Sequence, residues 1–168
     1  MPRRTMASSF GLAFLLLANT PTAAQTAKDV VGVWTLVSND TVRSDGSRVQ
    51  TFGANPAGLL ILDPSGRYSL QICRSERTKF ASNNRLQGTP EEYKEAIHAC
   101  NPHWGRYSVN ESDKAIVFKI EHATFANWEG LEQQRVFALS GDQLKYTVPA
   151  ASGGGIAEVV WRRATDSR

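Results

Sequence analysis

Two polar side chains interrupt apolar alternation in the second half of this 168-residue chain, and their types could do chemistry. His122 stands two positions after Ile120, and Arg135 stands two positions before Phe137. Histidine can act as a general acid or base, and arginine can hold an anion or stabilise developing negative charge. Because alternate residues of a strand share one face, we expect both side chains to face an apolar interior. Strands joined by a short connector usually pair, so the two should line one cavity.

A ligand-holding cavity is one of three arrangements that fit this pattern. An unpaired charge is costly in a dry core, and a wet cavity removes that cost. A hydrogen-bonded network near one end of a packed core would also satisfy the polar groups. A β-bulge would instead shift the phase and turn Arg135 outward. For the cavity we predict the following ligand-binding residues: Tyr68, Tyr107, His122, Asn127, Trp128, Arg135 and Tyr146.

Cys73 and Cys100 are the only two cysteines of the chain. In an oxidising compartment two thiols tend to pair, so we expect a disulfide that stabilises the fold by about 3–4 kcal/mol. Neither cysteine lies in a CxxC motif, and the three histidines show no metal-ligand spacing. The sequence therefore predicts no catalytic set, no metal site and no cofactor.

Residues 1–24 have the layout of a secretory signal peptide. A positively charged start precedes an apolar run at 10–18, and small residues stand before the expected cleavage after Ala24. The apolar run is far shorter than the roughly 20 residues of a membrane-spanning helix. We therefore expect a periplasmic or secreted protein whose mature chain, residues 25–168, has no membrane span.

The charge balance excludes a protein that binds nucleic acid or anionic membranes by electrostatics. The chain has 19 Lys and Arg residues against 16 Asp and Glu residues. Without the two arginines of the predicted signal peptide the balance is 17 against 16, a net charge of +1. Such a domain lacks the basic surface that phosphate backbones or anionic lipids require.

From residue 30 onward the dominant hydrophobic period is two, which is typical of β-strands. Turns rich in Gly, Pro and Asp separate the following predicted strands: residues 31–42, 48–53, 59–63, 67–73, 103–110, 114–123, 131–140, 143–149 and 156–163. Thr89, Pro90 and Glu92 predict one short helix near residues 89–100, opened by a capping box. This series predicts an all-β fold, an antiparallel barrel or sandwich.

An ordered set of short segments resembles the bacterial and fungal lipocalin-like domain family. It begins with Gly32-Val33-Trp34, similar to the Gly-x-Trp with which lipocalins open their first strand. The other matching segments are residues 45–47, 52–61, 80–81, 88–93, 105–107, 125–128 and 160–163. The resemblance implies an antiparallel lipocalin-like β-barrel of about 8–10 strands around an internal pocket. It also implies that Trp34 closes one end of the barrel against Arg162 or Arg163, as a structural contact.

Three classes of function fit this sequence. We expect an exported protein that binds a small hydrophobic or amphipathic molecule in the barrel, with polar residues orienting one end of it. The first alternative is a barrel enzyme of isomerase or cyclase type, with His122 as general acid–base and Arg135 stabilising negative charge. The second alternative is a structural or partner-binding domain with a filled barrel.

Overall fold

The computed structural model describes residues 26–151 and 154–165, so the predicted signal peptide at 1–24 lies outside the described residues. One antiparallel sheet contains these strands: β1 (Gly32–Val42), β2 (Arg48–Gln50), β3 (Ala57–Leu62), β4 (Arg67–Cys73), β5 (His103–Asn110), β6 (Ala115–Ala123), β7 (Glu132–Ser140), β8 (Gln143–Val148) and β9 (Ile156–Arg163). The helices of these residues are α1 (Ala27–Val30), α2 (Pro90–Ala99) and the 3-10 helix η1 (Ala126–Trp128). None of them has the length and apolar character needed to cross a membrane. Each predicted strand is present, with bounds that differ by a few residues at most.

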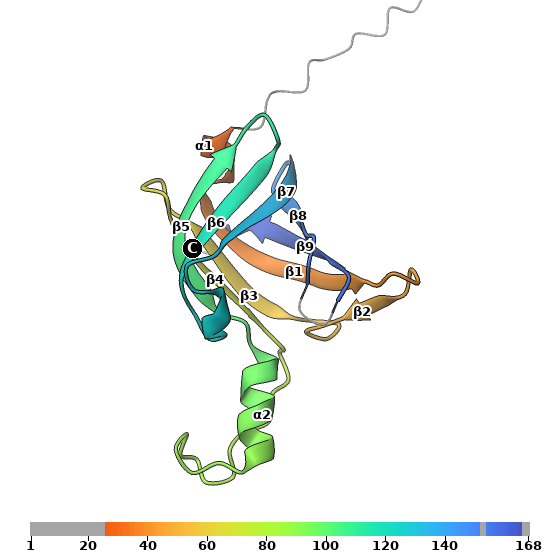
Figure 1. Cartoon of the computed structure of the whole chain (residues 1–168), viewed down its shortest axis with the longest axis vertical. Coiled ribbons are helices and arrows are strands. Elements are labelled where there is room, and N and C mark those ends of the chain that lie inside the picture. The colour runs from red at the N-terminus through yellow and green to blue at the C-terminus, as the bar shows by residue number, and fades with distance from the viewer. Residues whose placement is uncertain (1–25, 152–153, 166–168) are drawn as a thin grey trace, which may run out of the picture.

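The sheet closes into a barrel because β1 pairs along both of its edges (Figure 1). On one edge β1 pairs with β3 and then with β2. On the other edge it pairs with β9, from Trp34 opposite Arg163 to Val42 opposite Ile156. The strands β3 to β9 follow one another as antiparallel neighbours in chain order. Since β2 and β3 share one edge of β1, the barrel has eight strand positions and one extra strand, a lipocalin-like fold as predicted.

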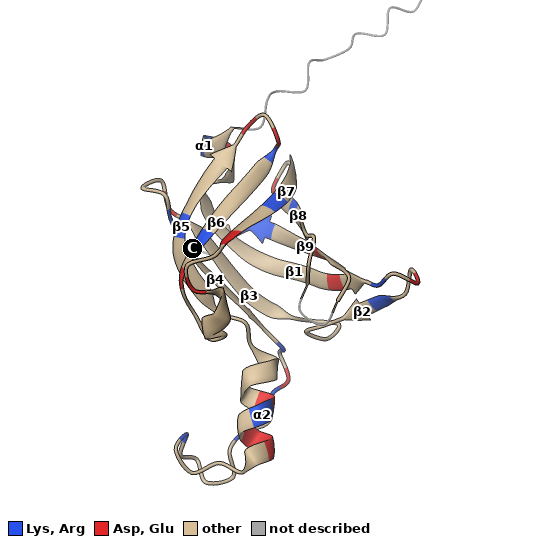
Figure 2. Ribbon diagram, in the orientation of Figure 1, with Lys and Arg blue, Asp and Glu red and all other residues tan. Residues whose placement is uncertain are grey.

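The strands bury one face and expose the other, as the period of two requires. The largest fully buried side chains include Trp34, Leu60, Leu62, Phe118, Tyr146 and Trp161. On the outside, basic and acidic residues share strands and loops (Figure 2) and form ion pairs such as Arg67–Glu121 and Arg48–Glu158. The barrel is therefore apolar within, and its outer charges are mixed in sign.

Trp34 and Arg163 close the end of the barrel beside α1. The Trp34 ring is fully buried, and its Nε1 donates a hydrogen bond to the Val30 carbonyl oxygen at 2.9 Å. The Arg163 guanidinium carbon lies 4.1 Å from the centroid of the Trp34 ring. Its two terminal nitrogens donate to the carbonyl oxygens of Val31 and Asp29. The cation thus stacks on the indole and satisfies the backbone around α1.

Of the two arginines that the resemblance suggested as partners of the tryptophan, Arg163 is the partner and Arg162 is not. Neighbouring residues of a strand point to opposite faces, and the Arg162 side chain points outward, with its Nε 3.9 Å from Asp142 Oδ2. The guanidinium of Arg163 also needs the space beside Gly32. Gly32 has φ of +140°, and a Cβ there would lie 2.7 Å from Arg163 Nη1. Glycine at this position therefore serves both the backbone conformation and the stacked arginine.

The helix α2 projects from the barrel on an arm that a disulfide ties at its base (Figure 1). Cys73 ends β4 and Cys100 follows α2, and these residues also pair as an isolated β-bridge. The predicted disulfide is therefore confirmed. The predicted capping box is present as well, because Thr89 Oγ1 accepts from Glu92 N while the Glu92 carboxylate accepts from Thr89 N.

Candidate ligand-binding site

The barrel encloses a partly open cavity of about 350 Å³. Its walls come from β1, β4, β5, β7, β8 and β9, and residues of the loops after β2 and β8 also line it. Its apolar surface includes Phe52, Leu70, Ile72, Trp128, Val148 and Val159. Its polar surface includes Asn39, Thr41, His103, Gln133, Arg135 and Tyr146. A volume in this range suits one small molecule.

Arg135 puts a positive charge on the wall of this cavity. It lies in the middle of β7 with 7% of its surface exposed, and its guanidinium carbon is 5.9 Å from the ring centroids of both Phe118 and Tyr146. One terminal nitrogen donates to Gln133 Oε1, while Nε is buried without a hydrogen-bond partner. Burial lowers the pKa of the guanidinium, and the hydroxyls of Tyr146 and Tyr68 act in the opposite direction. An arginine stays charged in proteins, so this cation is only partly satisfied by the protein.

His103, the first residue of β5, is the histidine that faces the interior. It is 2% exposed, and its Nδ1 shares a hydrogen bond of 2.8 Å with the Tyr68 hydroxyl. Burial, together with the nearby Arg135 charge, lowers the pKa of His103 to about 4. Burial raises the pKa of the Tyr68 phenol, so both groups are neutral near pH 7. Alternation with Tyr107 is the sequence signal that could have placed His103 in the predicted set.

Tyr146 and Asn39 are two further polar groups of the cavity. Tyr146 is 2% exposed, and burial raises the pKa of its phenol, an effect that Arg135 opposes. Asn39 is 8% exposed on β1 and was missed by the sequence reasoning. The pairing of β1 with β9 has an irregularity between Leu36 and Ser38, which shifts the inward phase onto Asn39. Alternation counted from the start of β1 would have placed this residue outside.

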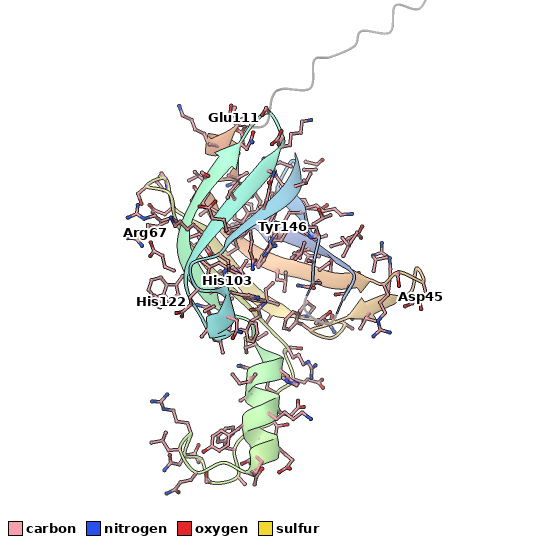
Figure 3. The ribbon with its side chains drawn as sticks, viewed as in Figure 1. Asp45, Arg67, His103, Glu111, His122 and Tyr146 are labelled. Atoms are coloured by element: carbon pink, nitrogen blue, oxygen red, sulfur yellow. A yellow bond between two sulfur atoms is a disulfide. The ribbon has the colours of Figure 1, made fainter. Side chains whose placement is uncertain are left out.

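His122 lies on the outside of the barrel, contrary to the expectation from alternation (Figure 3). Its side chain is 59% exposed, and its Nδ1 is 3.3 Å from Glu129 Oε1. Its ring packs on the exposed Trp104 ring, with centroids 4.6 Å apart. The prediction that His122 faces the cavity is therefore wrong.

A β-bulge in β6 is the physical reason for this error. Gly105 pairs with Ile120, but the next pair along β5 involves His122, which leaves Glu121 as an extra residue. One extra residue reverses the inward–outward phase of the rest of the strand. A Cβ on Gly105 would overlap the Lys119 carbonyl oxygen and lie 2.7 Å from Glu121 N. The bulge thus fits against β5 only because that position carries no side chain.

The cavity brings together three of the seven predicted residues: Trp128, Arg135 and Tyr146. Tyr68 lies in the core and contacts the cavity wall through its hydrogen bond to His103. The Tyr107 hydroxyl donates to the Asp63 carbonyl oxygen at 2.9 Å, away from the cavity. Asn127 is exposed in η1, the turn that also carries Trp128 to the cavity. The structure therefore does not place Tyr107 or Asn127 at the candidate site.

A known protein family matches this chain over the whole barrel. Residues 31–164 match the model of a family described as a lipocalin-like domain. The chain belongs to this family. The matched range contains every strand from β1 to β9 and so includes the walls of the cavity.

The lipocalin-like domain is similar to a fungal carrier protein. It is 28% identical over 105 residues to the 4'-hydroxy-3'-methoxypropiophenone carrier protein ppsC of Aspergillus oryzae, across 56% of this chain and 95% of that protein. A solved structure of a mutant of the fluorescent protein UnaG aligns with a TM-score of 0.39 and 13% identity, over 83% of this chain and 99% of the other. The lipocalin-like domain therefore has a relative whose name is that of a small-molecule carrier.

Proposed function

We propose that this protein is an exported carrier that binds a small, partly hydrophobic molecule inside its barrel. The observation that carries the proposal is a cavity of about 350 Å³ whose largely apolar wall includes the incompletely satisfied Arg135. A filled barrel would not leave a cavity of this volume. The named cargo of the fungal relative, an aryl ketone with hydroxyl and methoxy substituents, has the size and mixed polarity that such a cavity accepts.

The enzymatic alternative depended on His122 as a general acid–base. A proton-transferring group must lie within hydrogen-bond reach of its substrate. Because His122 is on the outer surface beside Glu129, it cannot reach a molecule held in the cavity. His122 is therefore not the general acid–base of a reaction in the cavity. The interior residues support a binding function.

Export is part of the proposal. The order of charged, apolar and small residues at 1–24 supports it, and so does the disulfide between Cys73 and Cys100, a bond typical of oxidising compartments. The mature carrier would begin near Gln25 and be periplasmic or secreted. The carrier would bind its amphipathic ligand without a cofactor. It would bind no nucleic acid, and its mature chain would have no membrane span.

Native mass spectrometry of the protein from the exported fraction of its own host tests both parts. We expect a chain that begins near Gln25 and carries a small molecule of unchanged mass. A chain that retains the apolar run at 10–18 would contradict export. A protein that holds no molecule and binds neither propiophenone nor the apolar dye N-phenylnaphthylamine would contradict the carrier function.

A pair of matched variants locates the binding in the barrel. Ala157 lines the cavity and is 5% exposed, so Ala157→Phe should fill the cavity and abolish dye binding. Ala138→Phe adds the same ring to the exposed face of β7 and should leave binding unchanged. Equal binding by both variants would place the dye outside the barrel.

A further inference from the structure

We infer that the ligand of the cavity is an amphipathic monoanion whose charged group binds to Arg135. This inference rests on the proposed function and specifies the chemical class of its ligand. The barrel interior contains a buried positive charge, on Arg135, that no buried acidic side chain of the described residues neutralises.

Among the described residues, no buried acidic side chain balances Arg135. In the part of the chain that the structure describes, the buried polar and charged residues are Asn39, Thr41, His103 and Arg135. Glu132 lines the cavity but is exposed, and among the ion pairs of the described residues none joins it to Arg135. The acceptors that the guanidinium does have are the neutral amide oxygen of Gln133 and the hydroxyl of Tyr146. The cation is therefore buried beside neutral groups.

The titratable groups around Arg135 do not supply a negative charge either. The pKa of His103 is lowered to about 4, and burial raises the pKa values of the phenols of Tyr68 and Tyr146. Near neutral pH the imidazole and both phenols are uncharged, which leaves the interior with one positive charge. A neutral ligand that displaced water would leave this charge without a counterion, whereas an anion would form charge-assisted hydrogen bonds with it.

Because Arg135 is the basic residue among the described residues that line the cavity, we expect a ligand with a single negative charge. The basic side chains Arg48 and Lys145 pair with Glu158 on the outer surface and do not line the cavity. A dianion such as a phosphate monoester would therefore carry one unpaired charge into a low-dielectric site. The apolar walls, with Leu70 and Ile72, fit a hydrocarbon or aromatic body. A carboxylate, sulfonate or phenolate group attached to such a body would supply the single negative charge that pairs with Arg135.

Two dyes with the same ring system test this inference: anilinonaphthalene sulfonate is a monoanion, and N-phenylnaphthylamine is its neutral counterpart. In titrations of the full mature protein we expect the sulfonate to bind more tightly. Arg135→Met should weaken sulfonate binding by about 10- to 100-fold, the worth of a charge-assisted hydrogen bond. Binding of the neutral dye should stay within about threefold, which also shows that the variant keeps its cavity. Arg162→Met removes an exposed arginine and should change neither affinity.

The outcomes separate this inference from the proposed function. If wild type binds the neutral dye as tightly as the sulfonate, or if Arg135→Met leaves sulfonate binding unchanged, the monoanion inference is overturned and the carrier function stands. If neither dye binds wild type, the inference is overturned, and the carrier function falls with it when the protein also holds no molecule from its host and binds no propiophenone. Weaker sulfonate binding in Arg135→Met with retained binding of the neutral dye supports both.

Discussion

The surroundings of His103 decide its protonation state. Its Nδ1 lies 2.8 Å from the Tyr68 hydroxyl, whose pKa is raised by burial, so the phenol keeps its proton and can donate it to a neutral imidazole. In an imidazolium the Nδ1 atom carries a proton and can no longer accept from the Tyr68 hydroxyl. Its positive charge would also stand near the Arg135 charge in a buried site. Protonation of His103 is therefore coupled to loss of the native structure.

This coupling predicts a pH dependence of stability. The pKa of His103 is about 4 in the folded protein, against about 6.5 in an unfolded chain. Between these values the unfolded chain binds more protons, so the free energy of unfolding falls as the pH drops from about 6.5 to about 4. The full difference corresponds to about 3 kcal/mol.

Urea unfolding at several pH values measures this contribution. From about pH 7 to about pH 4, wild type should lose about 3 kcal/mol more stability than His103→Gln, in which no imidazole titrates. His98→Gln, on the exposed face of α2, should keep the wild-type dependence. Parallel curves for wild type and His103→Gln would show that this imidazole is not held neutral.

Arg135 and His122 show how far single residues can be placed from sequence. Alternation placed Arg135 inside correctly because β7 pairs with both of its neighbours without a register shift. It failed for His122 because the bulge at Glu121 depends on Gly105, a residue of another strand. The sequence of β6 alone contains no sign of this bulge. Residue placement is therefore predictable up to the first irregularity of a strand.

At the level of elements, the bulge in β6 makes a prediction about Gly105. A Cβ at this position would overlap the Lys119 carbonyl oxygen, a backbone atom that cannot rotate away. Gly105→Ala should therefore destabilise the protein by about 1–3 kcal/mol, as overpacking of a well-packed site does. Ser108→Ala, on the exposed face of the same strand, should have little effect in the same urea titration. Wild-type stability of Gly105→Ala would mean that the bulge can relax at no cost.

The strands and the helix α2 were predictable because their signals are local. A period of two marks the strands, and the Asp63-Pro64-Ser65-Gly66 turn and the Thr89 capping box mark element ends. The structure differs in β2, which ends at Gln50 although the predicted strand extends to Gly53. Gly53 has φ of +83° and donates from its N–H to the Gln50 carbonyl oxygen, so a turn replaces the last residues of the predicted strand.

At the scale of the whole molecule, the cavity follows from how the strands close. Pairing of β1 with β9 determines which inward side chains share the interior, and it brings Asn39 and Val159 to one lining surface. These residues are 120 positions apart in the chain, so no local pattern links them. Resemblance to the lipocalin-like family predicted a pocket, but the members of its wall depend on bulges and closure. The sequence therefore predicted the presence of a cavity better than its residues.

The charge of the whole molecule makes a last prediction about how an anion reaches Arg135. Residues 25–168 have a net charge of +1, and outer charges of both signs are mixed on the barrel (Figure 2). A near-neutral protein exerts little long-range attraction on an anion, and the buried guanidinium is screened much less than a surface cation. The affinity for anilinonaphthalene sulfonate should therefore change less than about threefold between about 0.05 and 0.5 M salt. The neutral dye corrects for the effect of salt on apolar burial. A tenfold or greater loss of sulfonate affinity, with no loss for the neutral dye, would place the anion on surface cations instead of Arg135.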